Sequence, residues 1–271
     1  VISPVNDDPS SVRNRIAQLA RRNEDLALEY IFDPQLYNPA SDRGQLSEWR
    51  YFPRDFETAN RSEPRWWANV ARVMVDEAAS LGLNAVCSPA EVPSRWSDEY
   101  FQFVAGIADQ TKAAADAAGL DTLLTAIIRL RELANPRRAL DIASILTASR
   151  CDRVYLTFLV EDHEQRAPIM EPDSLPTAVH LVRLLSRDMR VHVAFAAHDM
   201  VLWKYAGATD ASSGKFLNLR RFSPGRWMED EGGIKQQNQY WNESRLLTLL
   251  REQDVARLRR NRSNWVTGYD L

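Results

Sequence analysis

Apolar positions in the middle of the chain follow two alternating patterns. Segments 66–82 and 98–119 place apolar residues at i, i+3 and i+4, which is typical of amphipathic helices. Between and after them, segments 83–89 and 121–129 are short runs of Val, Ile, Leu, Phe and Ala. Such runs are typical of parallel strands that are buried on both faces. The alternation predicts an α/β protein in which right-handed helical crossovers join consecutive parallel strands.

The pattern predicts six strands and five helices. The expected strands are 26–32, 83–89, 121–129, 151–161, 190–198 and 208–216, and the expected helices are 66–82, 98–119, 134–149, 175–188 and 198–207. Neither G-x-G-x-x-G nor G-x-x-x-x-G-K-[ST] is present, so we expect a (β/α) TIM-like barrel in preference to a doubly wound nucleotide-binding sheet. A closed barrel has about eight strands. Either further strands lie in segments such as 49–56, or the barrel is incomplete or irregular.

The same patterns divide the chain into three regions. Residues 1–25 form an N-terminal arm and helix, residues 26–227 form the α/β barrel, and residues 228–271 form a C-terminal basic helical extension. Within the extension, residues 244–260 are strongly amphipathic and predict a helix appended to the barrel.

Composition narrows the class of protein. With 271 residues, 45% of them hydrophobic and 26% charged, the chain has enough apolar material for a globular core, which excludes a disordered or collagen-like protein. Its apolar runs are far shorter than the roughly 20 residues of a membrane span. Two distant cysteines, Cys87 and Cys151, form neither a disulfide framework nor a zinc motif, so we expect a reducing, cytoplasmic location.

Four titratable residues at the ends of expected strands are the candidate catalytic residues. They are Asp33, Glu161, His198 and Asp210. Functional residues of such barrels gather at the carboxyl ends of the strands. Carboxylates that are crowded there have divergent pKa values, which suits acid–base or nucleophilic chemistry. The structural alternatives are that Asp33 caps a turn before a proline and that His198 belongs to a helix cap.

Further polar residues at the same strand ends are candidates for substrate binding. They are Gln35, Tyr37, Ser88, Arg129, Ser213, Gly214 and Lys215. The backbone amides around Gly214, next to Lys215, suit an anion site, although a glycine that allows close packing is an equal alternative. No zinc motif is present and we expect no metal or cofactor, while magnesium held by carboxylates has no fixed spacing and stays open.

The C-terminal part of the chain is basic although the whole chain has a net charge of −3. Residues 215–262 contain eleven Lys and Arg against six Asp and Glu, a local charge of +5. The candidate nucleic-acid-binding residues are Arg245, Arg257, Arg259, Arg260 and Arg262. Nearby Trp and Tyr residues could stack on bases while arginines neutralise phosphates. A protein-binding or solvated helix face is the competing interpretation.

Residues 123–216 carry a family resemblance. The segment VHVAFAAHDMVLWKYAGATDASSG combines a strand that ends in Ala-His, a helix, and a strand that opens with small residues and Asp. Before it come LLTAIIR, PRRALDIASILTAS and CDRVYLTFLVE. This order resembles the barrel half of tRNA-guanine transglycosylases and of their DNA-acting relatives that insert deazaguanine bases. The resemblance implies a purine-like base or nucleotide in the barrel mouth and DNA or RNA along the basic tail.

Two features depart from that family. Ser212 or Ser213 stands where the family has its aspartate nucleophile, with Asp210 close by, and the family's Cys3His zinc site is absent. Asp33 or Asp210 would then have to replace the nucleophile.

The sequence therefore predicts an enzyme directed at a nucleobase or N-glycoside, which exchanges a base or transfers a glycosyl group on a nucleotide or nucleic acid. In this hypothesis Glu161 is the partner acid, His198 and Arg129 orient the substrate, and Lys215 holds an anion. The alternative is a catalytically degenerate barrel that serves as a recognition subunit for nucleic acid or protein. A hydrolase of another small polar substrate is a third possibility, because fold does not fix function.

Overall fold

Six parallel strands form one curved sheet in the order of the chain. The computed structural model describes residues 1–22, 26–160, 171–214, 220–228, 240–243 and 248–260. The strands are β1 (Ile31–Phe32), β2 (Ala85–Cys87), β3 (Asp121–Arg129), β4 (Arg153–Leu159), β5 (Arg190–Val193) and β6 (Asp210–Ala211). Each pairs in parallel with the next, in the order β1-β2-β3-β4-β5-β6. The protein is an α/β protein whose described strands form an incomplete barrel.

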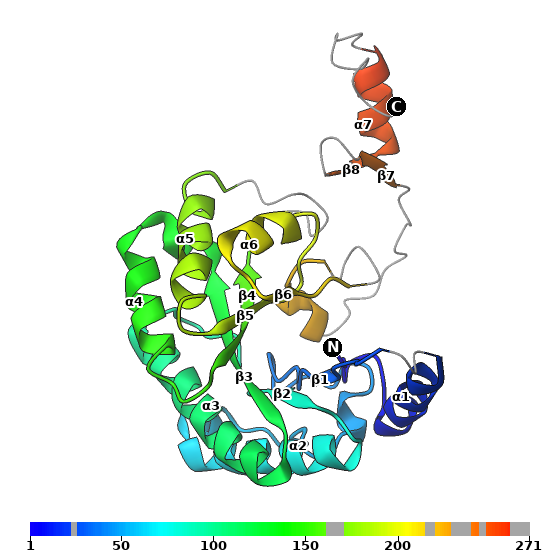
Figure 1. Ribbon diagram of the computed structural model, residues 1–271, viewed down its shortest axis with the longest axis vertical. Coiled ribbons are helices and arrows are strands. Elements are labelled where there is room, and N and C mark those ends of the chain that lie inside the picture. Colours follow the sequence, from blue (N-terminus) through cyan, green and yellow to red (C-terminus); the bar gives the residue numbers. More distant parts are fainter. Residues whose placement is uncertain (23–25, 161–170, 215–219, 229–239, 244–247, 261–271) are drawn as a thin grey trace.

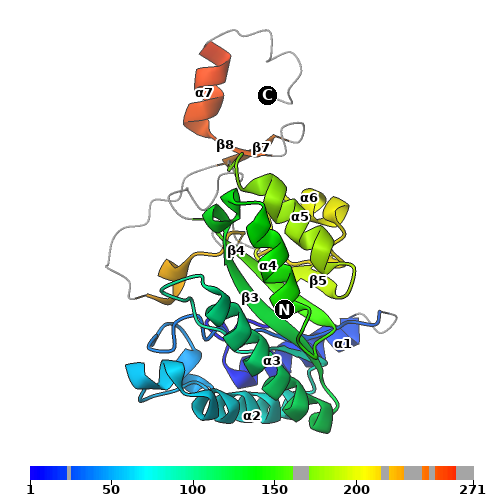
Figure 2. The same ribbon diagram turned by 90° about the vertical axis from the view of Figure 1, so that its left-hand side faces the viewer.

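Helices alternate with the strands and cover the outer face of the sheet (Figures 1 and 2). They are α2 (Pro64–Ser80), α3 (Asp98–Ala118), α4 (Arg137–Leu146), α5 (Leu175–Leu185) and α6 (Met200–Ala206), and α1 (Pro9–Arg22) precedes them. The outward strand residues Leu124, Leu156 and Val191 are buried against helix residues such as Ile142 and Leu181. Burial of these apolar surfaces holds the helices on the sheet.

The inner face of the sheet is more polar than the outer face. Tyr155, His192 and Asp210 occupy paired positions on β4, β5 and β6. At the amino ends of the strands, the buried guanidinium of Arg153 forms ion pairs with Glu29 and with Asp121, the latter at 2.7 Å. Next to this charged end, Tyr155 packs in a small apolar cluster with residues such as Ile31 and Leu123.

The N-terminal arm belongs to the sheet edge. The amide of Ile2 donates to the carbonyl oxygen of Ile31 at 2.8 Å, and the amide of Asp33 donates to the carbonyl oxygen of Ile2 at 3.3 Å. Ile2 thus forms a parallel bridge to Phe32 beyond β1. The arm covers the first edge of the open barrel.

Several expected elements differ from the structure. The strands expected at 190–198 and 208–216 are reduced to β5 (Arg190–Val193) and β6 (Asp210–Ala211) within the described residues. The strand expected at 26–32 contains only Ile31 and Phe32, and segment 49–56 contributes no strand. That segment packs Trp49 and Tyr51 against Phe32 at ring distances of 4.9 and 5.6 Å, so its aromatic residues fill the core. The prediction of one helix over residues 244–260 is wrong for residues 248–251. Thr248–Arg251 is strand β8, paired antiparallel with β7 (Tyr240–Glu243), and α7 (Glu252–Arg260) begins only after it.

Gly44 allows Val5 of the N-terminal arm to approach its backbone closely, and this contact gives a first prediction. Its φ is +63°, and a Cβ there would lie 2.0 Å from the carbonyl oxygen of Val5. Gly82 has a similar φ of +70° but no atom within 4 Å of such a Cβ. Both Gly→Ala variants incur backbone strain of about 1 kcal/mol, but only Gly44→Ala displaces the arm. We expect it to lower the free energy of unfolding by about 2 kcal/mol more than Gly82→Ala.

Chemical denaturation of the two variants measures this difference. Equal losses of stability would mean that the arm does not depend on the close approach of Val5 to Gly44.

Within the described residues, no helix combines the length and the apolar content that crossing a membrane would require.

Candidate active site

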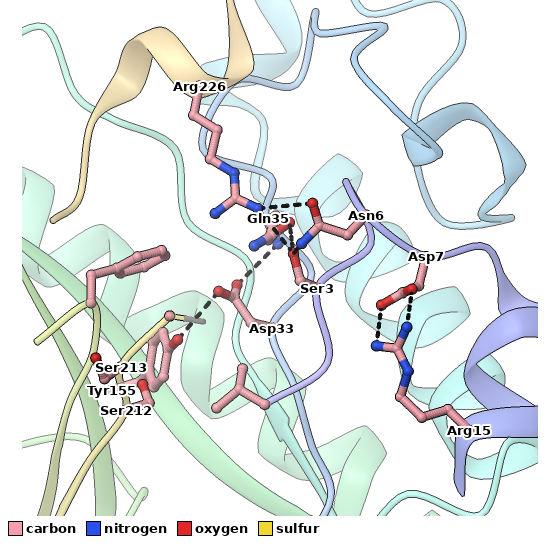
Figure 3. A pocket seen from close by; sticks show the side chains of 13 residues that line it. Ser3, Asn6, Asp7, Arg15, Asp33, Gln35, Tyr155, Ser212, Ser213 and Arg226 are labelled. Carbon is pink, nitrogen blue, oxygen red and sulfur yellow. Dashed lines mark hydrogen bonds and ion pairs between the residues drawn. The ribbon is translucent and has the colours of Figure 1, made fainter. Parts of the chain in front are cut away.

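A cavity of about 640 Å³ opens between the two edges of the incomplete barrel. One wall comes from the arm, which contributes Ser3, Asn6 and Asp7. The opposite wall comes from the segment after β6, residues 212–214. Figure 3 shows both walls around a carboxyl group, that of Asp33, at the carboxyl end of β1. The cavity thus lies where functional residues gather in barrels.

The side chain of Asp33 is buried at the base of this cavity. It is 2% exposed. Its Oδ1 accepts hydrogen bonds from the amide of Gln35 and from the hydroxyl of Tyr37, both at 3.1 Å. Burial raises the pKa of Asp33 to about 6, against the opposing effects of these hydrogen bonds and of the positive charge of Arg226. The carboxyl group therefore titrates close to neutral pH, as an acid–base catalyst must.

Two tyrosine hydroxyls hold Oδ2 of Asp33. Tyr37 donates to it at 3.1 Å and Tyr155 at 3.4 Å. Burial raises the pKa of both tyrosines well above 10, so both remain protonated donors. Tyr155 lines the cavity from β4, and Tyr37 contacts Asp33 without lining the cavity.

Unusual backbone conformations border the same cavity. Gln35 and Phe195 both have a φ of 53°, and they are the non-glycine residues with positive φ in the described part of the chain. Both line the cavity. Residues with positive φ are uncommon and cluster at functional sites. The side-chain oxygen of Gln35 also accepts from Ser3 Oγ at 3.0 Å and from the amide of Val5 at 3.2 Å, which joins the arm to the loop after β1.

An aromatic cluster places Arg226 over the cavity. The Trp227 ring lies 4.7 Å from that of Tyr37 and 5.4 Å from that of Phe222, measured between centroids. Phe222 in turn forms a parallel bridge to Leu159 at the end of β4. These contacts fix the short helical turn Pro224–Trp227, from which the Arg226 side chain enters the cavity (Figure 3).

Some of the residues expected from the sequence gather here and others do not. Asp33, Gln35, Ser213 and Gly214 line the cavity, and Tyr37 contacts Asp33 without lining it. Ser88 does not line it, because its hydroxyl and carbonyl oxygens bind Thr125 within the sheet. Arg129 lies instead over the Trp96 ring at 5.1 Å.

Neither His198 nor Asp210 lines the cavity. His198 is half-buried before α6, where Asp199 accepts from the amide of Ala197 at 2.8 Å and from Arg221 at 2.8 Å. Asp210 is exposed on β6. The sequence predicts that four titratable groups line one cavity. Among the described residues, Asp33 is the one of these four that does so.

The remaining candidates divide into two groups. Glu161, Lys215, Arg245 and Arg262 lie outside the described residues, as does the side chain of Arg259. Arg257 and Arg260 lie on α7, in a hollow that they share with the acidic residues Glu252 and Asp254. The basic face therefore also carries negative charge.

The sequence reasoning missed Ser3, Asn6, Tyr155 and Arg226. Tyr155 could have been found from its alternation with outward-facing Val154 and Leu156 along β4. The arm residues and Arg226 gave no such signal, because they are distant in sequence from the strands that they meet. No three His, Cys, Asp or Glu residues gather as metal ligands within the described ranges.

Comparison with solved structures finds a weak likeness in fold. No protein-family model and no curated protein matches this chain. A solved structure titled "Structure of L-ribulose 3-epimerase" is similar over 79% of this chain and 69% of its own, with 14% sequence identity and a TM-score of 0.34.

Proposed function

We propose that this protein is an enzyme that acts on a nucleobase or an N-glycosidic bond, with Asp33 as its acid–base group or nucleophile. The buried Asp33 carboxyl at the base of a polar cavity carries this proposal. A pKa of about 6 leaves the carboxyl mainly ionised at neutral pH yet able to hold a proton. The resemblance of residues 123–216 to base-exchanging enzymes suggests the substrate class.

The chemistry needs one carboxylate and a leaving base. In hydrolysis, a water oxygen forms a bond to the anomeric carbon and gives its proton to the Asp33 carboxylate. The carbon–nitrogen bond breaks, and the base leaves with the electron pair and takes up a proton. In base exchange, the Asp33 carboxylate forms a glycosyl ester as the first base leaves, and the incoming base displaces the carboxylate with loss of a proton.

The cavity suits such a substrate in size and lining. Its volume of about 640 Å³ is within the usual range for small-molecule sites. The Phe195 ring lines one wall and offers an aromatic face to a base, while the serine hydroxyls after β6 offer hydrogen bonds. Tyr37 and Tyr155 keep the Asp33 carboxyl in place.

A base-exchange assay tests the proposal. Guanosine, guanosine 5′-monophosphate and a short guanine-containing oligonucleotide are incubated with labelled guanine or 7-deazaguanine, and base release and incorporation are followed by chromatography. We expect Asp33→Asn to lower the rate at least about 100-fold. We expect the wild-type rate to rise with pH through about 6, because the reacting carboxyl must be ionised.

A second buried carboxyl provides the matched control. Glu77 is 5% exposed and its pKa is raised by burial, but it accepts a hydrogen bond from the amide of Arg50 away from the cavity. Glu77→Gln should keep the wild-type rate. The enzyme proposal fails if no substrate in the panel turns over, or if Asp33→Asn is as active as the wild type. The alternative, a recognition subunit for nucleic acid or protein, would then be tested first at Arg257 and Arg260.

A further inference from the structure

Two arginines line the cavity, Arg15 and Arg226, and within the described residues Arg226 lacks a carboxylate partner. Arg15, at the rim of the same cavity, forms a bidentate pair with Asp7 at 2.6 and 2.7 Å. Arg221 binds Asp199 at 2.8 Å. Among the described residues, no carboxylate oxygen lies within 4 Å of the Arg226 guanidinium. Its Nη2 donates to two neutral oxygens, Ser3 Oγ at 3.4 Å and Asn6 Oδ1 at 3.3 Å.

The guanidinium is also partly removed from water. Arg226 is half-buried among the arm, the loop after β1 and the Trp227 ring, and this burial lowers its pKa. The Asp33 carboxylate opposes this shift from beyond ion-pair distance. Because no carboxylate among the described residues contacts the guanidinium, an incoming anion would offset the cost of its partial burial. The planar fork of arginine suits two oxygens of a phosphate or carboxylate group.

The opposite wall offers less to an anion than the sequence suggested. The amide of Ser212 is used in the sheet, where it donates to the carbonyl oxygen of Val193 at 2.9 Å. The carbonyl oxygen of Gly214 accepts from Arg220 Nε at 3.2 Å. Within the described residues, the Ser213 hydroxyl remains on this wall, because the Ser212 hydroxyl is engaged with Tyr155. The positive charge without a carboxylate in contact comes from Arg226, on the other side of the cavity.

We propose that Arg226 binds a phosphate group of the substrate at the mouth of the cavity and so presents the attached nucleoside to Asp33. The phosphate belongs either to a mononucleotide or to a polynucleotide backbone. The choice of a nucleoside rests on the proposed function, whereas the anion site rests on the contacts of Arg226 itself.

Calorimetric titration of the full chain tests the anion site with two probes at matched ionic strength, guanosine 5′-monophosphate and guanosine. We expect the monophosphate to bind the wild type at least about 10-fold more tightly. Arg226→Gln should remove this advantage without weakening guanosine, and Arg226→Lys should keep part of it. Equal affinity of the two probes for the wild type, or an unchanged advantage in Arg226→Gln, would overturn the proposal.

Arg15→Gln is the matched control, because it removes the same charge from the same cavity. Since Asp7 already neutralises Arg15, the preference for the monophosphate should change by less than about twofold. A loss as large as that in Arg226→Gln would assign the effect to the general field of the cavity and reject a direct contact.

Inorganic phosphate separates this proposal from the proposed function. We expect phosphate, compared with chloride at equal ionic strength, to raise the Tm of the wild type by about 2 °C and that of Arg226→Gln by none. If neither nucleoside probe binds but this shift appears, the base-directed function fails and the anion site stands. If neither the probes nor phosphate has an effect, both proposals fail.

A guanine-containing decamer identifies the source of the phosphate. Binding at least 10-fold tighter than that of the monophosphate, with a steeper dependence of log Kd on log salt, indicates a polynucleotide backbone. Equal or weaker binding indicates a mononucleotide.

Discussion

Asp33→Asn should make the protein more stable at pH 7.5, by about 3 kcal/mol. Burial raises the pKa of Asp33 from its ordinary value of 3.8 to about 6. The stability that its protonated form contributes is fully present below pH 3.8 and is lost as the pH rises through 6. One pKa unit corresponds to about 1.4 kcal/mol. Asparagine keeps an oxygen for the amide of Gln35 and for Tyr37 without carrying the buried charge.

Urea denaturation at pH 7.5 and 4.5 measures this effect. At pH 4.5 the gain should shrink to about 1 kcal/mol, because the wild-type carboxyl is then largely protonated. Asp199→Asn is the contrasting control. Asp199 accepts from Arg221, from the amide of Ala197 and from the Trp203 indole, so this variant should lose about 1–2 kcal/mol. An Asp33→Asn variant that is no more stable than the wild type at pH 7.5 would mean that the Asp33 carboxylate is well solvated or well paired.

A gain in stability together with a loss of activity would mark Asp33 as a functional group. A carboxyl kept for structure has the opposite signature, because its removal destabilises the protein. Functional sites hold groups in environments that are unfavourable for folding, and stabilising substitutions there tend to reduce activity.

His192 should make the free energy of unfolding depend on pH in the opposite sense to Asp33. It is 6% exposed, and neither ring nitrogen has a hydrogen-bond partner among the residues that the structure describes. Burial lowers its pKa from 6.5 to about 4, with Asp210 opposing this shift and Arg153 adding to it. The stability contributed by neutral His192 is present above pH 6.5 and is lost as the pH falls through 4. Between pH 7.5 and 4.5 this loss amounts to roughly 2.5 kcal/mol.

His192→Phe isolates this contribution. Phenylalanine keeps an aromatic ring beside Tyr155, whose ring centroid lies 5.2 Å from that of His192. Other buried carboxyls such as Glu91, whose pKa burial raises to about 6, add to the pH dependence of every variant, so each variant is compared with the wild type. We expect the change in stability from pH 7.5 to pH 4.5 to be about 2.5 kcal/mol more favourable in His192→Phe than in the wild type, and about 2 kcal/mol less favourable in Asp33→Asn. Identical pH dependence of the wild type and His192→Phe would show that His192 is not desolvated.

The periodicity of the sequence identified the architecture because burial on both faces constrains composition. The strands β3 and β4 and the helices α2 and α3 are long segments with continuous or regularly spaced apolar residues, and their positions agree with the prediction. Short elements escaped this reasoning. β1 has two residues, and β8 depends on pairing with β7, so neither has a local pattern of its own.

The candidate site was predictable only in part, for a related reason. Asp33, Gln35 and Tyr37 follow a strand directly, so their place at its carboxyl end follows from the sequence order. Ser3 and Arg226 are separated from that strand by long stretches of chain, and no rule of spacing brings them together. His198 lies in the turn before α6, and Asp210 opens β6 beside His192 and so lies at the amino end of its strand; neither lines the cavity.

The sequence by itself determined the class of fold, the order of the helices and strands, and one carboxyl group at a strand end, because local periodicity and chain order suffice for these. Only the tertiary structure decided that the barrel is incomplete among the described residues. It also decided that the N-terminal arm and the turn that carries Arg226 line the cavity between the two edges of the sheet, and that Asp33 is buried there. Burial and charge proximity arise from contacts between distant segments, and these contacts turn an ordinary aspartate into a group that titrates near pH 6.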